Sequence, residues 1–253
     1  MTSLLIKQKA QQYVVLTGMA LFIGLLVGAI DMIFGQGLLL IGDFRSQHWP
    51  LILFLAVAGL VIVYLYKRFG GKASKGMGLI FDVGHAREEK IPLVLVPLIM
   101  LTTWMSHLFG GSVGREGVAV QIGATLSHRF ARYIKIPDAS RIFLMTGMAA
   151  GFAGLFQTPL AATFFALEVL TVGELQLIAL YPALIASIVA SFTSHALGLE
   201  KFAVPLKETL SWTPETLIKV ALLGLTFGLA GKLFAVSLSW LKKTVAQVLP
   251  NPY

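Results

Sequence analysis

Residues 110–124 read GGSVGREGVAVQIGA, and they place a carboxylate at the start of an otherwise apolar helix. The glycines around Glu116 allow a ligand to approach the backbone closely. The free N–H groups and the positive dipole end of such a helix, near Val118–Val120, favour an anion. Glu116 thus stands where an anion should bind, and it becomes neutral when it takes up a proton. The segment therefore predicts an anion site that is linked to protons.

The composition places this carboxylate inside a membrane. Only 13% of the residues are charged, 57% are hydrophobic, and the mean hydropathy is +0.82. A carboxylate within a membrane is costly and marks a functional site by default. No soluble domain is expected, so residues 1–253 form one transmembrane unit. The expected apolar spans lie at about 13–34, 50–66, 91–109, 116–134, 175–195 and 214–241.

The cysteine count and the distribution of charge exclude further kinds of site and protein. The chain has no cysteine, which excludes disulfides and thiolate metal sites, and no metal site is predicted. The net charge of +8 is spread over short loops, so it does not indicate nucleic-acid binding. Most basic residues fall on the side of the N-terminus, in 7–9, 67–90, 129–141 and 242–243. This bias predicts a multi-pass protein of the plasma membrane with a cytoplasmic N-terminus.

The early segments are expected to form a returning pair followed by a broken helix. Residues 13–34 run outward and 50–66 return, joined by a polar external loop around residues 43–45. Residues 76–84 are too short to span the membrane. Their glycines favour a loop that feeds a half-helix starting within it.

A second break is expected in the middle of the chain. Gly147, Gly151 and Gly154 are spaced four and three residues apart, which allows close helix contact in lipid. Thr158 as N-cap and Pro159 at the first helical position would start a new helix. Residues 139–153 and 159–170 therefore predict a broken re-entrant pair, which is typical of a transporter site near the midplane.

Three motifs, in order, resemble the CLC family of chloride channels and proton-coupled anion antiporters. Gly114-Arg115-Glu116-Gly117, continuing to Gln121, resembles its GREGPxVQ signature. Residues 76–80, GMGLI, occupy the place of its GSGIP loop, and 156–168 resemble its FNAPLA…FxxE segment. The resemblance implies an all-α fold of inverted repeats with broken re-entrant helices. The recognisable motifs belong to the first repeat, so a C-terminal half is expected to be required.

The resemblance also implies roles for individual residues. Glu116 would be the gating glutamate, which occupies an anion position when ionised and swings aside when protonated. Arg115 would belong to the anion loop, or would only anchor it. No cofactor is implied; the ligands are the transported anion and protons. The implied anion-binding loops comprise Gly76, Met77, Gly78, Ile80, Gly114, Arg115, Gly117 and Val118.

Departures from the chloride pattern point to one branch of the family. Met77 stands where the chloride-type loop has serine. Ile80 and Val118 each stand where a family motif has proline. Val169 stands where chloride/proton antiporters have an internal glutamate. These features resemble the CLC-F branch and imply fluoride export in exchange for protons. Two alternatives stay open: a chloride-selective channel or antiporter, and a structural half-module that is inactive without the missing half.

The remaining candidates have modest expected roles. Glu168 is expected to be a helix-end carboxylate, and His107 to pack or hydrogen-bond locally. A serine hydrolase is not expected, and no enzymatic activity is expected. In the family, helices around 163–190 form a homodimer interface. The apolar residues expected there, if they do not face lipid, are Phe164, Leu167, Leu177 and Ile185.

Overall fold

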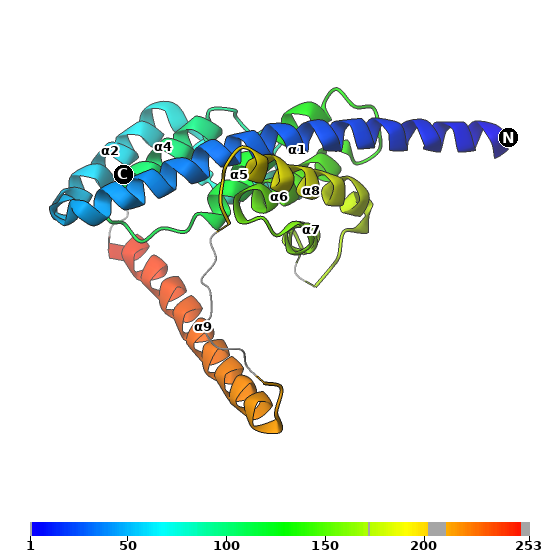
Figure 1. Ribbon diagram of the computed structural model, residues 1–253. Coiled ribbons are helices and arrows are strands. Elements are labelled where there is room, and N and C mark those ends of the chain that lie inside the picture. The colour runs from blue at the N-terminus through cyan, green and yellow to red at the C-terminus, as the bar shows by residue number, and fades with distance from the viewer. Residues whose placement is uncertain (1, 172, 202–210, 249–253) are drawn as a thin grey trace. The chain divides into compact units, whose positions relative to one another are not determined.

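The computed structural model describes residues 2–171, 173–201 and 211–248, and these residues form helices, turns and loops without a strand. The predicted all-α class is confirmed (Figure 1). The chain divides into two units, Met1–Phe202 and Ala203–Tyr253. The α-helices of the first unit are α1 (Thr2–Gln47), α2 (Leu55–Leu65), α3 (Met77–Gly84), α4 (Leu95–Leu108), α5 (Glu116–Ala131), α6 (Ala139–Phe156), α7 (Pro159–Glu168) and α8 (Leu180–Ala196).

Short helical turns connect several of these helices. A π-helical turn lies at Tyr66–Gly70, and 3-10 turns lie at Trp49–Phe54, Gly71–Lys75 and Leu177–Ala179. The second unit contains α9 (Pro214–Val248). Thr213 precedes α9, and its hydroxyl accepts the Thr216 N–H at 3.2 Å. This bond satisfies one of the donors that a helix start leaves open.

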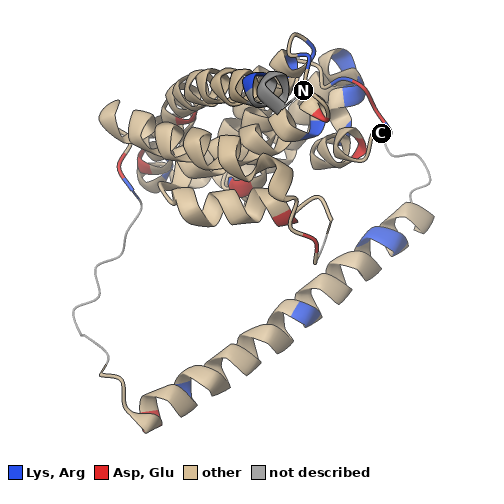
Figure 2. Ribbon diagram, turned by 90° about the vertical axis from the view of Figure 1, so that its right-hand side faces the viewer, with Lys and Arg blue, Asp and Glu red and all other residues tan. Residues whose placement is uncertain are grey.

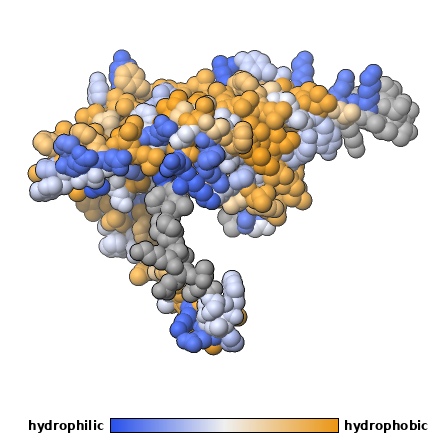
Figure 3. Space-filling model, in the orientation of Figure 1, coloured by the Kyte–Doolittle hydropathy of each residue, from blue (hydrophilic) through white to orange (hydrophobic). Residues whose placement is uncertain are grey.

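Several stretches are long and apolar enough to cross a membrane. They are Ala10–Gln47, Trp49–Gly84, Ala139–Phe156, Leu177–Ala196 and Pro214–Val248. Two further apolar helices, α4 and α7, are shorter. Figure 2 shows that the helices carry few charges along their lengths, and Figure 3 shows apolar side chains over much of the visible surface of the first unit. An apolar surface of this kind is suited to contact with lipid chains.

Helix α1 is longer than the sequence predicts. It continues to Gln47, so the expected polar loop around residues 43–45 is wrong. Gly35 and Gly37 lie within this helix, and they are packed against Leu199 and Trp104 respectively. The helix ends only shortly before Pro50, whose ring cannot continue the hydrogen-bond ladder.

Helix α6 lies at the centre of the first unit, packed against α1, α5, α7 and α8. A Cβ atom on Gly123 of α5 would overlap the Gly147 carbonyl of α6, and one on Gly151 would overlap the Ala119 carbonyl. The two backbones are therefore in direct contact, as the glycine spacing predicts. Helices α1 and α8 cross in the same way, with Gly24 against Val189.

The break between α6 and α7 is confirmed, although α6 continues to Phe156 instead of ending near residue 153. Gln157 turns the chain with a φ of 53°, and Pro159 then begins α7. Thr158 occupies the N-cap position as predicted, but its side chain makes no capping hydrogen bond. Its hydroxyl is buried without a partner among the described residues.

Candidate functional site

The start of α5 presents the predicted carboxylate. Glu116 is the first residue of the helix and is exposed, and Arg115 is its N-cap. The Arg115 carbonyl accepts the Ala119 N–H at 3.1 Å. The N–H groups of the first turn, including those of Gly117 and Val118, have no acceptor within a helix. They are the donors that an anion or the Glu116 carboxylate itself can use.

Arg115 joins this helix start to the end of α6. Its guanidinium lies over the Phe156 ring, 5.3 Å from the ring centroid. A cation in this position is attracted by the electron-rich face of the ring. The contact fixes the residue before Glu116 to the last residue of α6. This favours the anchoring role for Arg115 over direct binding of the anion.

The second predicted loop, at 76–80, becomes the start of α3. Gly76 has φ 54° and ψ −127°, a backbone conformation that residues with a Cβ rarely adopt. Met77 is half-buried and Gly78 is exposed, and both lie in the first turn of α3. Ile80 is fully buried in the core, so its side chain contributes packing. At this loop only backbone N–H groups and the Met77 thioether can face an anion.

Gln121 of α5 lies beside the start of α3. Its amide Nε2 donates to the Gly117 carbonyl of α5 at 2.9 Å. Its Oε1 would lie 3.5 Å from a Cβ on Gly76, and it is buried without a hydrogen-bond partner among the described residues. Gln121 of α5 therefore lies against Gly76, the residue before α3, without a hydrogen bond to it. Gln121 belongs to the GREG motif, but sequence reasoning gave it no role.

The other candidates lie apart from these helix starts. Glu168 is exposed at the end of α7, a helix that packs on α6 and α8. The expected local role of His107 is supported, because its Nδ1 lies 2.9 Å from the Thr103 carbonyl oxygen. Leu167 is fully buried within the chain, so its expected place in a dimer interface is wrong. It is on the face of α7 that turns inward.

Asp31 is a carboxylate that sequence reasoning missed. It lies in the middle of α1 and is fully buried, and neither oxygen has a hydrogen-bond partner among the described residues. One of its oxygens approaches the position where a Cβ of Gly154 would be. An acidic residue inside the apolar run 13–34 was the available signal.

The geometry invites comparison with known proteins. A family profile described as "Voltage gated chloride channel" matches residues 58–253. The chain belongs to this family. It is 36% identical over 216 residues to a chloride/fluoride channel protein of Pseudomonas syringae pv. tomato, covering 85% of this chain and 48% of that protein. It is 30% identical over 162 residues to a voltage-gated ClC-type chloride channel of Salmonella typhimurium, covering 64% and 35% respectively.

Solved structures give the same family. A CLC-type fluoride/proton antiporter matches with a TM-score of 0.88 and 47% identity, covering 95% of this chain and 61% of that one. A slow cyanobacterial Cl−/H+ antiporter matches with a TM-score of 0.67 and 23% identity, covering 85% and 54%, which shows the shared fold. The predicted resemblance to the CLC family and its fluoride/proton branch is confirmed.

The family is one of membrane channels and antiporters, and this CLC chain is a multi-pass membrane protein. The chain spans about half the length of the curated relative of 36% identity. The activity of a whole transporter is therefore a matter of proposal.

Proposed function

We propose that the chain forms the N-terminal half of a CLC-type fluoride/proton antiporter that exports fluoride. The observation that carries this proposal is the position of Glu116, exposed at the first residue of α5. One side chain of α5, Gln121, lies against Gly76, next to the start of α3. A titratable acid thus lies at the start of α5, and α5 packs against α3, whose start is the second predicted loop.

The mechanism follows from competition for those donors. An ionised Glu116 satisfies first-turn N–H groups and occupies the anion position. When it is protonated, the carboxyl loses its charge and its attraction to the helix start, and fluoride takes its place. Arg115, held on Phe156, keeps the adjoining backbone in place while the Glu116 side chain moves. Anion and proton movements are thereby linked.

The choice of fluoride rests on two observations. Met77 gives the α3 start a thioether and no hydroxyl donor, and the match to the fluoride/proton antiporter is closer than that to the Cl−/H+ antiporter, at 47% against 23% identity. The polarisable sulfur lines the path while backbone N–H groups supply the donors. Chloride selectivity is the alternative in the same architecture.

The setting of the transporter is part of the proposal. The transporter would lie in the plasma membrane, and the bias of basic residues supports a cytoplasmic N-terminus. Homodimerisation would use exposed apolar side chains of 163–190, among them Phe164 and Leu177, whereas Ile185 is partly buried against the core. The inward-facing Leu167 is not among them.

The test uses a completed transporter, meaning this chain followed by the remainder of the fluoride/proton antiporter that it matches. In liposomes, Glu116→Gln should keep fluoride movement but lose the accompanying proton movement, because the amide does not titrate. Glu168→Gln, at an exposed helix end, is the matched control and should keep both. Normal proton movement in Glu116→Gln would exclude Glu116 as the gate.

A further inference from the structure

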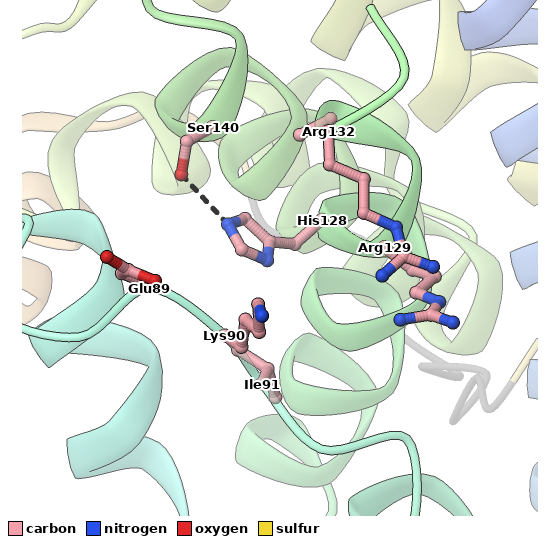
Figure 4. A pocket seen from close by; sticks show the side chains of 8 residues that line it. Glu89, Lys90, Ile91, His128, Arg129, Arg132 and Ser140 are labelled. Atoms are coloured by element: carbon pink, nitrogen blue, oxygen red, sulfur yellow. Dashed lines mark hydrogen bonds between the residues drawn. The ribbon is translucent and has the colours of Figure 1, made fainter.

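A basic pocket lies where α5 ends and α6 begins, apart from the anion site. Its volume is about 220 Å³. Figure 4 shows His128 in its middle, with Ser140 on one side and Arg129 and Arg132 on the other. Lys90, from the segment before α4, lies below the imidazole ring. The residues that line it are Glu89, Lys90, Ile91, His128, Arg129, Ala131, Arg132 and Ser140.

The cations of this pocket are not neutralised within the described part of the chain. No carboxylate there lies within 4.0 Å of the charged nitrogens of Lys90, Arg129 or Arg132. By contrast, Lys72 and Lys75 pair with acidic residues at 2.6 and 2.9 Å. Glu89 is the pocket's one carboxylate, so the lining carries a surplus of positive charge.

The floor of the pocket is a fixed polar group. His128 is only 8% exposed, and its Nε2 lies 2.8 Å from the Ser140 hydroxyl oxygen. This bond ties the last turn of α5 to the first turn of α6. The two arginines are three residues apart at the same helix end. The Arg132 guanidinium lies over the Tyr133 ring and donates to the Tyr133 hydroxyl at 2.6 Å.

The pocket suits a phosphate group. Guanidinium groups donate pairs of hydrogen bonds to phosphate oxygens with a geometry that lysine cannot match. At about 220 Å³ the pocket is smaller than the roughly 300–1,000 Å³ of sites that enclose a whole small molecule. It can hold a headgroup and would leave the rest of the molecule outside.

The surroundings identify what the headgroup belongs to. A second hollow, of about 600 Å³, is lined from the residue after Arg132 onward and combines apolar side chains with two glutamines and Lys135. Its lining is Gln11, Gln12, Val15, Tyr133, Ile134, Lys135 and Ile136. Basic pockets between membrane helices on the cytoplasmic side are suited to anionic lipid headgroups. We propose that the Arg129–Arg132–Lys90 pocket binds the phosphate of an anionic phospholipid, whose chains lie outside it.

Native mass spectrometry of the chain in neutral detergent tests this proposal. The probes are dioctanoyl phosphatidylglycerol, dioctanoyl phosphatidylcholine and glycerol 1-phosphate. We expect one molecule of phosphatidylglycerol to be retained, with much weaker binding of the zwitterionic lipid and of the soluble phosphate. Each cation near a headgroup contributes about fivefold, so Arg129→Gln/Arg132→Gln should weaken binding about twenty-five-fold.

The control is Lys67→Gln/Arg68→Gln, which removes two charges outside the pocket and should leave binding unchanged. Lys90→Gln reaches the pocket from another segment, and it should weaken binding by about fivefold even where the arginine variant does not fold. Equal losses in the control and pocket variants would overturn the proposal, because bulk charge would then explain binding. Equal binding of phosphatidylcholine, or of glycerol 1-phosphate, would also overturn it.

Discussion

At the scale of single residues, Gln121 of α5 is the side chain that lies against Gly76, next to the start of α3. Its amide donates to Gly117 and its oxygen faces Gly76. Gln121→Leu keeps the side-chain size but removes both polar groups, leaving the Gly117 carbonyl without that donor. We expect fluoride efflux from liposomes containing the completed transporter to fall about two- to tenfold, since a partly buried hydrogen bond contributes about 0.5–1.5 kcal/mol.

The matched control for this change is Gln11→Leu, an exposed glutamine near the N-terminal end of α1. Its efflux should equal that of the unmodified protein. Wild-type efflux in Gln121→Leu would show that the two helix starts do not depend on this contact.

Glu88 offers a test of electrostatics outside the spans. The Lys72 ammonium donates a 2.6 Å hydrogen bond to it and lowers the pKa of the Glu88 carboxyl below its ordinary value of 4.5. A lowered pKa in the folded state gives stability that is present above the unfolded value. That stability is lost as the pH falls from 4.5 through the lowered value.

We therefore expect Glu88→Gln to lower the thermal unfolding temperature at neutral pH and to have no effect well below the lowered pKa. The neighbouring Glu89→Gln, which has no ion pair among the described residues, should have little effect at either pH. A Glu88→Gln effect of the same size at both pH values would show that the ion pair is not its source.

At the scale of elements, the α5–α6 contact holds the site in place. α5 begins at Glu116, and α6 ends at Phe156 beneath Arg115. Gly147→Val would drive a side chain into the Gly123 backbone, and helix backbones cannot yield as a flexible side chain does. We expect a loss of about 1–3 kcal/mol in unfolding free energy, measured by denaturant titration in detergent.

Gly42→Val is the control for this change. Gly42 also lies within a helix, but a Cβ there would meet nothing within 4 Å. Any loss it shows reports helix propensity alone. Equal losses in the two variants would mean that the close approach of α5 and α6 contributes nothing to stability.

The elements also show what a sequence can predict. Some helix starts can be predicted because the residue type sets the backbone conformation at its own position. The structure places such starts at Gly76, Thr158 and Pro159. Other features depend on distant parts of the chain. Asp31 lies against Gly154 and Gln121 against Gly76, and Leu167 is on a helix face that turns inward. In a helix that is apolar on every side, periodicity cannot tell the protein-facing side from the lipid-facing side.

The end of α1 illustrates a related difficulty. Asp43 and Arg45 are charged, which favoured a loop, yet they sit in the last turns of a helix. Polarity there reports exposure, and a helix that emerges from a membrane is exposed at its end. Only a backbone-breaking residue such as Pro50 distinguishes the two cases.

At the scale of the whole molecule, the proposed transport needs both repeats. An inverted-repeat site near the midplane takes helix ends from each repeat. This chain supplies the starts of α3 and α5, and it covers 61% of the matching fluoride/proton antiporter. Without the partner repeat, backbone donors at these starts lack the wall that would enclose an ion. We expect liposomes containing this chain alone to release no fluoride above protein-free liposomes.

The most direct test of the central claim is proton movement driven by a fluoride gradient across liposomes that contain the completed transporter. We predict that the outward movement of fluoride drives protons into the liposomes with no imposed pH gradient, and that an equal chloride gradient drives much less proton movement. Fluoride release without proton movement would contradict antiport, and proton movement driven equally by chloride would contradict fluoride selectivity.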